Sequence, residues 1–307
     1  MRTHLHPLIL AALPVALVSG APAVADAQPA QKITIGIYAP SVEFGTAQAR
    51  LAYVKALARA IEQSTGIETE AQSYANVAAL VKDDVDFAII EAQCYATNLG
   101  WKLLATANVG GSTSRPWALY SSMGPDMRSL RDKKLAYVST GCNDAGFIDN
   151  AMLESEVAPG FFGSRVGKLD LAAAIAEVAS YRTAHAVFAP VGSGKGLTKV
   201  FDTGSVPNPA FVSIGRRLSA DVVNKVAAAV TRYGGGGAIA SWQKPSREPY
   251  AALASRMGKV VKNGVFAPPA LVRLDMRDVL VEPASAREPA LPPVRQHFVR
   301  SPGARMQ

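Results

Sequence analysis

The sequence predicts an α/β protein made of two lobes with a cleft between them. The hydrophobic periodicity switches repeatedly between a strand-like and a helix-like pattern, and this switching occurs in two successive blocks. The chain is 49% hydrophobic but only 7% aromatic, and small apolar residues suit α/β layers better than a β-sandwich. With 307 residues, it can bury a full core and divide into lobes.

The first block reads as a β-α-β-α-β unit. Ile33, Ile35 and Ile37 alternate along one predicted strand, and the apolar stripe of the following helix ends at Gly66, a favoured residue just after a helix. The predicted strands are Lys32–Tyr38, Ile67–Ser73 and Val85–Ile90, and the helices are Thr46–Ser64 and Asn76–Val81. Such a unit predicts a parallel sheet with right-handed crossovers.

The second block contains four predicted strands and two helices, and the chain then returns to the first lobe. The strands are Leu103–Val109, Trp117–Ser121, Lys134–Val138 and Ala184–Ala189, and the helices are Asn143–Glu154 and Leu171–Ser180. Strand Ala210–Ile214 and helices Ser219–Val230, capped by Ser219, and Tyr250–Lys259 follow. We expect lobe one to comprise residues 32–109 plus 207–275, and lobe two residues 110–206.

Both ends of the chain differ from this pattern. Residues 1–27 have basic residues, an apolar run from Leu8 to Val18 and small residues before Ala27, which predicts a cleaved signal peptide and a periplasmic protein. Pro14 interrupts the apolar run, so a membrane anchor is the weaker interpretation. Residues 276–307 are basic and rich in proline, which predicts a disordered tail.

The residues do not indicate an enzyme or a nucleic-acid-binding protein. The formal charge is +8, but the basic residues are scattered along the chain. Beyond the signal segment there are only His185, which we interpret as structural, and His297, so neither a metal site nor a catalytic triad is indicated. Residues 192–196 lack the spacing of a phosphate-binding loop, and we expect no cofactor. A Cys142 thiolate is the single feature that an enzyme hypothesis can use.

Four stretches in order carry a resemblance to a known family: Ile35–Pro40, Val85–Ala88 leading to Cys94–Ala96, Leu135–Leu153 and Ser205–Val212. Together they resemble the phosphate-, phosphite- and phosphonate-binding proteins of ABC importers, which have the type 2 periplasmic-binding fold. The resemblance implies a periplasmic, monomeric binding protein that takes a phosphonate or related oxyanion from solution to an inner-membrane ABC permease.

The resemblance also implies where the ligand binds. The family places a Ser-Thr-Ser-Gly run at a helix N-terminus, where N–H groups hold the oxyanion. Ungapped alignment puts Cys142–Ala145 on that run, and a shifted alignment lets Ser139–Gly141 supply the donors while Asp144 caps the helix. The predicted ligand-binding residues are Tyr38, Ser41, Glu91, Tyr95, Ser139, Thr140, Gly141, Cys142, Asn143 and Asp144.

Two carboxyl groups leave the charge of the ligand open. If Asp144 and Glu91 both face the cleft, a cationic or zwitterionic ligand fits better than an oxyanion, because unpaired carboxylates are costly to desolvate. Glu91 either holds an amine or lies solvated at the rim. The alternative function is a non-transport sensing or envelope module of the same fold, with an altered pocket or no ligand.

The two cysteines, Cys94 and Cys142, approach the predicted cleft from opposite walls. An oxidising compartment lets them bridge if their Cα atoms come within about 7 Å. Two unpaired, partly buried thiols are the alternative, and the sequence leaves both open.

Overall fold

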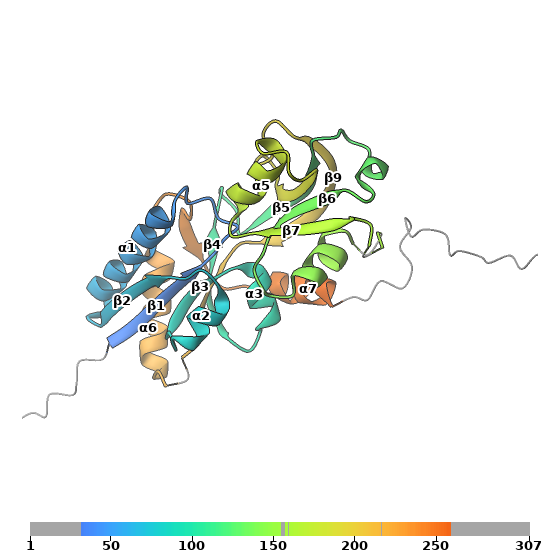
Figure 1. The fold of residues 1–307 in the computed structure, drawn as a ribbon. Helices are drawn as coiled ribbons and strands as arrows, with labels where there is room; N and C mark the ends of the chain where they lie inside the picture. Colours follow the sequence, from blue (N-terminus) through green and yellow to red (C-terminus); the bar gives the residue numbers. More distant parts are fainter. Residues whose placement is uncertain (1–31, 155–156, 159, 216, 259–307) are drawn as a thin grey trace, which may run out of the picture. The chain divides into compact units, whose positions relative to one another are not determined.

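The chain folds into two mixed α/β lobes, each built around its own sheet (Figure 1). The computed structural model describes residues 32–154, 157–158, 160–215 and 217–258. The predicted signal peptide, residues 1–27, and the predicted tail, residues 276–307, lie outside these residues. The two-lobed α/β class expected from the sequence is confirmed.

The first sheet has the strand order β11-β4-β10-β3-β1-β2. Its strands are β1 (Lys32–Tyr38), β2 (Glu68–Ser73), β3 (Phe87–Ile90), β4 (Lys102–Asn108), β10 (Ala210–Ser213) and β11 (Ser241–Gln243). Strand β1 pairs in parallel with β2 and β3, as the β-α-β-α-β pattern predicts. The sheet as a whole is mixed, because β10 pairs antiparallel with both β3 and β4, and β11 pairs antiparallel with β4.

The second sheet has the order β7-β6-β8-β5-β9 and is also mixed. Its strands are β5 (Ser114–Ser121), β6 (Lys134–Val138), β7 (Ser164–Lys168), β8 (Ala186–Pro190) and β9 (Thr198–Pro207). Strand β6 runs parallel to β7 and β8, whereas β5 runs antiparallel to β8 and β9. All five strands fall between Ser114 and Pro207, and the lobe boundaries remain a prediction.

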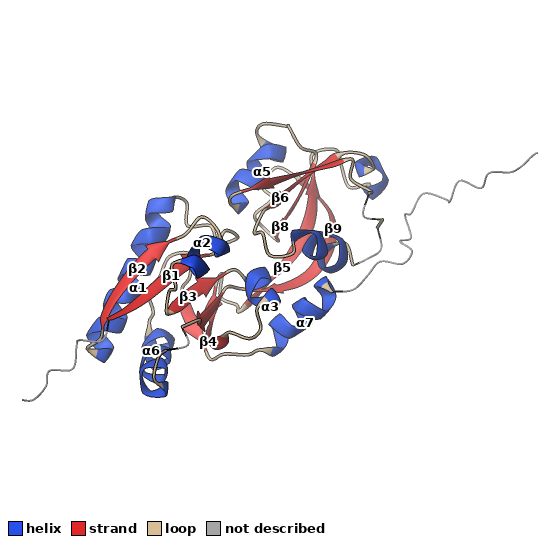
Figure 2. Ribbon diagram, turned by 60° about the horizontal axis from the view of Figure 1, so that its bottom comes forward, coloured by secondary structure: helices blue, strands red, loops and turns tan. Residues whose placement is uncertain are grey.

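Helical segments pack on both faces of each sheet (Figure 2). On the first sheet, Ile33, Ile35 and Ile37 pack in one core with α1 (Ala47–Thr65) and α6 (Ala220–Arg232). On the opposite face, Leu80 of α2 (Val77–Lys82) joins a second core with residues of α3 (Ala92–Thr97). Helix α5 (Leu171–Ala179) packs on the second sheet, and a short 3-10 helix, η1 (Met127–Leu130), precedes β6.

Helix α7 (Glu248–Met257) contacts elements of both lobes. It packs against α3, against β9 and against the helical segment η2 (Phe147–Met152). Its buried residues Tyr250, Leu253 and Met257 belong to a core that also contains Ala88 of the first sheet and Phe188 of the second. The two lobes therefore share apolar packing as well as chain crossings.

Sequence signals for helix ends are confirmed, but one predicted helix is not regular. Gly66 ends α1 with φ 72°, and the Ser219 side chain accepts a hydrogen bond from Val222 N–H. The predicted helix over 143–154 is instead a three-residue turn, α4 (Asp144–Gly146), followed by the π-helical segment η2 (Phe147–Met152). The expected helix N-terminus with several free N–H groups is therefore wrong for this turn.

Three strands were not predicted from the sequence: β7, β9 and β11. Strand β9 is polar, carries Gly204 at φ 82° and has register shifts against β5, so it lacks clean alternation. All three are edge strands, which need only one paired neighbour and have little apolar surface to reveal them.

Within residues 32–258, excluding 155–156, 159 and 216, no helix is long and apolar enough to cross a membrane. The same residues contain no cluster of three or more side chains suited to bind a metal ion.

Candidate functional site

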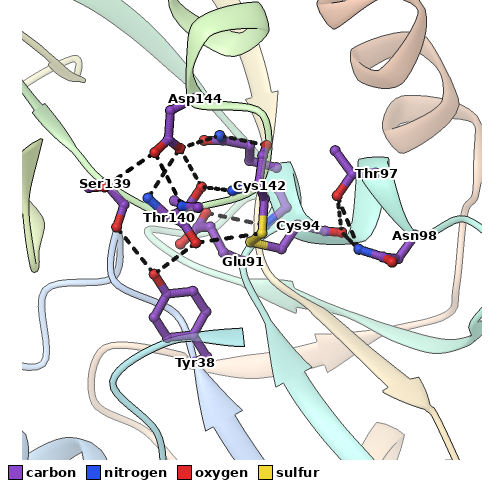
Figure 3. Close-up of a disulfide and its surroundings, with 12 residues drawn as sticks. Tyr38, Glu91, Cys94, Thr97, Asn98, Ser139, Thr140, Cys142 and Asp144 are labelled. Carbon is purple, nitrogen blue, oxygen red and sulfur yellow. Dashed lines mark hydrogen bonds between the residues drawn. A yellow bond between two sulfur atoms is a disulfide. The ribbon is translucent and has the colours of Figure 1, made fainter. Parts of the chain in front are cut away.

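The candidate site lies where β1, β3 and β6 end, at the border of the two lobes (Figure 3). Ser41 follows β1 and Glu91 follows β3 in the first sheet, and the turn 139–144 follows β6 in the second. The carboxyl ends of parallel strands are where α/β proteins place their binding sites. The parallel pairing of β1 with β3 brings Ser41 and Glu91 to one edge.

The Asp144 carboxylate accepts hydrogen bonds from its own turn. Its Oδ1 accepts from Thr140 N–H at 3.1 Å and from the Thr140 hydroxyl at 2.7 Å. Its Oδ2 accepts from the Ser139 hydroxyl and from Gly141 N–H, both at 3.2 Å. The donors expected to hold an oxyanion are thus already bonded to a carboxylate of the chain itself.

Two left-handed residues shape this turn. Gly141 has φ 71° and Asn143 has φ 59°, a region that glycine and asparagine tolerate best. The Asn143 side chain also accepts a hydrogen bond from Gly146 N–H, which holds α4 in place. The chain therefore folds back so that Asp144 faces Thr140 and Gly141, and the wider η2 segment follows. π-helical segments are frequent at functional sites.

Glu91 is buried at 5% exposure and bonds to the first lobe. It accepts hydrogen bonds from Ser41 N–H at 3.0 Å, from the Ser41 hydroxyl at 2.9 Å and from Ala92 N–H at 3.2 Å. Arg115 also bonds to Ser41, since its Nη2 donates to the Ser41 carbonyl and hydroxyl oxygens at 3.3 Å. Burial lowers the pKa of Arg115, and the Glu91 charge opposes that shift.

Several hydrogen bonds join the first lobe to the turn 139–144. The Tyr38 hydroxyl donates to the carbonyls of Ser139 and Thr140 at 3.3 and 3.4 Å. The Gln93 amide donates to the Cys142 carbonyl at 2.9 Å and to Asp144 Oδ1 at 2.7 Å. Burial raises the pKa of Tyr38, and the charges of Glu91 and Asp144 raise it further, so Tyr38 stays a donor at neutral pH.

A disulfide joins Cys94 of α3 to Cys142 of the turn, with the Cα atoms 5.0 Å apart (Figure 3). Cys94 is fully buried and Cys142 is 7% exposed. Of the two arrangements left open by the sequence, this structure contains the bridge.

The pocket next to this bridge is small and mostly apolar. Gln93 and Glu91 line it from the first lobe, and Thr140 and Asp144 from the second. Its full lining is Ser41, Glu91, Gln93, Trp117, Tyr137, Val138, Thr140, Asp144, Phe147, Ile148, Phe188 and Val206. The free volume is about 20 Å³, room for roughly one water molecule.

The structure brings some predicted residues to this pocket and places others elsewhere. Ser41, Glu91, Thr140 and Asp144 line it. Tyr38, Ser139, Gly141, Cys142 and Asn143 lie in the surrounding hydrogen-bond network and are not among its lining residues.

Tyr95 lies apart from the pocket lining. It is buried at 1% exposure, with its ring 4.9 Å from that of Tyr250 in an edge-to-face contact. Its expected place at the cleft does not agree with this packing, because Gln93 and Tyr95 are two positions apart on α3 and so lie on nearly opposite sides of the helix. Gln93 points to the pocket instead.

Sequence reasoning missed Gln93 and the aromatic side of the pocket. Trp117, Tyr137, Phe147 and Phe188 lie on β5, β6, η2 and β8, and they meet only after the second sheet is assembled. The sole signal was that Gln93 is a polar residue between Glu91 and Cys94, directly after a buried strand.

No known protein-family model and no curated protein matches the chain in sequence. In structure, it is similar to the binding-protein component of an ABC phosphonate transporter from Pseudomonas aeruginosa, with TM-score 0.56 and 13% identity over 72% of this chain and 84% of that chain. It is also similar to PhnD1 from Prochlorococcus marinus in complex with methylphosphonate, with TM-score 0.56 and 11% identity over 76% and 100% of the two chains.

A protein from Xanthomonas citri solved with bound ATP is similar as well, with TM-score 0.55 and 12% identity over 74% of this chain and 97% of that chain. At these identities, the likeness shows the fold. The chain has the two-lobed type 2 periplasmic-binding-protein fold.

Proposed function

We propose that the chain is a periplasmic solute-binding protein that holds a small organic cation or zwitterion in the pocket between its lobes. The observation that carries the ligand class is the Asp144 carboxylate, which takes the N–H and hydroxyl donors of Thr140 and the N–H of Gly141. An oxyanion at this turn would have to displace a negative charge that is covalently part of the chain.

The electrostatics of the pocket favour a positive group. Among its lining residues there are two carboxylates, Glu91 and Asp144, and no Lys, Arg or His. Every hydrogen bond described for Asp144 comes from a neutral donor, whereas Glu91 has Arg115 nearby. Neutral donors leave the negative charge of Asp144 in place. A cation beside Asp144 would neutralise it.

The apolar wall suits an alkylated ammonium group. Trp117 and Phe147 meet edge to face with ring centroids 6.2 Å apart, and Tyr137 and Phe188 complete the aromatic lining. Aromatic faces attract organic cations through the negative charge of their π systems, and tryptophan does so most strongly.

The proposal includes delivery of the ligand to an inner-membrane ABC permease. It is supported by the fold, by the leader-like pattern of residues 1–27 and by the structural neighbour that is a component of an ABC phosphonate transporter. A phosphonate or related oxyanion, which that resemblance implies, is the competing ligand class and an outcome of the test below.

A second candidate function is a sensing or envelope module of the same fold that does not take part in transport. One observation favours it: the disulfide between Cys94 and Cys142 restrains the two walls of the pocket, whereas transport requires the site to open and release its ligand. A neighbouring gene for a permease or for a sensor kinase would discriminate between the two functions.

Calorimetric titration of protein stripped of ligand by unfolding and refolding tests the proposal. Methylammonium, tetramethylammonium, aminoethylphosphonate and inorganic phosphate are titrated, each with and without dithiothreitol because the bridged pocket has little free volume. We expect heat with the amines once the bridge is reduced, and none with phosphate in either condition. Heat with phosphate alone would establish the oxyanion class, and no heat with any compound would favour the module.

Matched charge variants locate the binding. Asp144→Asn removes the charge in the pocket, and Glu62→Gln removes an equivalent charge on the exposed surface of α1. We expect Asp144→Asn to weaken amine binding by about tenfold or more, which corresponds to about 1.4 kcal/mol. Equal affinities of the two variants would contradict a cation site at Asp144.

A further inference from the structure

We propose that the Cys94–Cys142 bond is a redox latch on the pocket: the disulfide form is closed and takes no ligand, and the dithiol form opens and binds. The inference rests on the proposed function and adds the regulation of the same site. It is carried by the position of the bridge, by the residues beside it and by the volume of the bridged pocket.

The bridge connects opposite walls of the pocket. Cys94 belongs to α3, directly after strand β3 of the first sheet, and Cys142 belongs to the turn after strand β6 of the second sheet. Figure 3 shows the bond between these two segments, next to the hydrogen bonds of Asp144 and Tyr38. No other cysteine is present in the chain, so each sulfur has a single intramolecular partner.

The bridged residues are immediate neighbours of pocket-lining residues. Gln93 precedes Cys94, and Thr140 and Asp144 lie two residues to either side of Cys142. Disulfide geometry holds the two Cα atoms within about 7 Å, and here they are 5.0 Å apart. While the bond is intact, the walls cannot separate at this point by more than about 2 Å.

The closed pocket is too small for the proposed ligand. Its free volume of about 20 Å³ holds roughly one water molecule, whereas an alkylated ammonium group needs several times that space. Ligand entry therefore requires Gln93 to move away from Thr140 and Asp144, which the bond prevents.

The other contacts near the latch can break reversibly. Besides apolar packing, they are hydrogen bonds. The Tyr38 hydroxyl donates to Ser139 and Thr140, Gln93 donates to Cys142 and Asp144, and Leu171 N–H donates to the Pro40 carbonyl at 3.0 Å. Water replaces such bonds when a site opens, so each has a small net effect on the equilibrium. The disulfide is the covalent element among them.

The switch needs a dithiol reductant. A reductant thiolate attacks one sulfur, and Cys142 is the more exposed partner, at 7% against 0% for Cys94. The S–S bond breaks, a mixed disulfide forms, and the other cysteine leaves as a thiolate. The second thiol of the reductant then releases the first cysteine. Two electrons and two protons pass to the protein, and the reductant becomes a cyclic disulfide.

Hydrogen exchange and calorimetry on the same samples test the latch. The samples are the mature oxidised protein, the protein reduced with dithiothreitol, and the Cys94→Ser/Cys142→Ser variant. In the last two we expect faster exchange of the Leu171 amide, whose bond to Pro40 joins the two lobes, with unchanged exchange in β8 as internal reference. We expect methylammonium or tetramethylammonium to bind these two samples at least tenfold more tightly than the oxidised protein.

The controls separate the latch from the proposed function. Dithiothreitol added to the double variant should change nothing, and the reduced natural protein serves as the open form if that variant does not fold. Equal amine affinity in oxidised and reduced protein, or unchanged exchange on reduction, would overturn the latch. Faster exchange on reduction with no amine bound in any sample would support the latch and refute the proposed ligand class.

Discussion

Asp144 and Thr140 form a closed pair at the end of β6: one carboxylate oxygen accepts both the N–H and the hydroxyl of the same threonine, at 3.1 and 2.7 Å. The Ser139 hydroxyl and Gly141 N–H also donate to Asp144, so these donors of the turn are all engaged in hydrogen bonds. The turn thus carries its own anion, which is the basis of the proposed cationic ligand class.

Replacing Asp144 by alanine should turn this site towards oxyanions. The change leaves the donors of Thr140 and Gly141 unpaired and should lower the free energy of unfolding by about 2 kcal/mol. Inorganic phosphate should then raise the melting temperature of Asp144→Ala, but not that of the natural protein or of Glu62→Ala. A phosphate effect on the natural protein would show that Asp144 does not block the turn.

Removing the bridge should lower the free energy of unfolding of the whole protein, in addition to releasing the walls of the pocket. The two cysteines are 48 residues apart, and a loop of that length corresponds to about 4 kcal/mol of lost chain entropy in the unfolded state. Urea denaturation of Cys94→Ser/Cys142→Ser should show this decrease. If the variant and the natural protein unfold at the same urea concentration, the bridge is not formed in solution, which counting free thiols in denatured, unreduced protein would verify.

The tyrosines should make the protein sensitive to alkali. Burial raises the pKa of Tyr38, Tyr53 and Tyr250, and burial together with Asp83 raises the pKa of Tyr74 to about 12. Unfolded tyrosines ionise near pH 10, so above that value the folded state binds more protons than the unfolded state. The free energy of unfolding should therefore be fully retained below about pH 10 and fall as the pH rises beyond it.

A spectrophotometric titration checks this expectation. The tyrosinate absorbance of these residues should appear together with loss of the circular dichroism of the folded protein, and not before it. Tyr38→Phe should reduce the slope of stability against pH above about pH 10. Complete ionisation of all tyrosines in a folded protein would contradict the assigned burial.

Gly146 should not tolerate a side chain. A Cβ atom there would lie 2.4 Å from Asn143 Nδ2 and 2.6 Å from the Met257 carbonyl oxygen, so α4 and α7 would have to separate. Gly146→Ala should lower the free energy of unfolding by about 1–3 kcal/mol. Gly100→Ala, where no atom lies within 4 Å of the added Cβ, is the matched control and should change it by less than about 0.5 kcal/mol. Equal effects in urea denaturation would contradict the close packing of α7 on Gly146.

The sequence alone determined the fold class, the first sheet's β-α-β-α-β core and the ends of its helices. These features depend on local signals: the alternation of Ile33, Ile35 and Ile37, the glycine at position 66 and the serine cap at position 219. Such signals act within one turn or one strand, so they can be read along the chain. The positions of Ser41, Glu91 and Asp144 after strands also followed from that order.

Only the tertiary structure decided the character of the site. The bond from Gln93 to Asp144, the approach of Cys94 to Cys142 and the aromatic wall of Trp117, Phe147 and Phe188 join segments far apart in the sequence. The turn's two left-handed residues and the short α4 bring Asp144 back onto Thr140, where a regular helix would have left free donors. Contacts of this kind depend on packing between elements, which no local pattern of residues encodes.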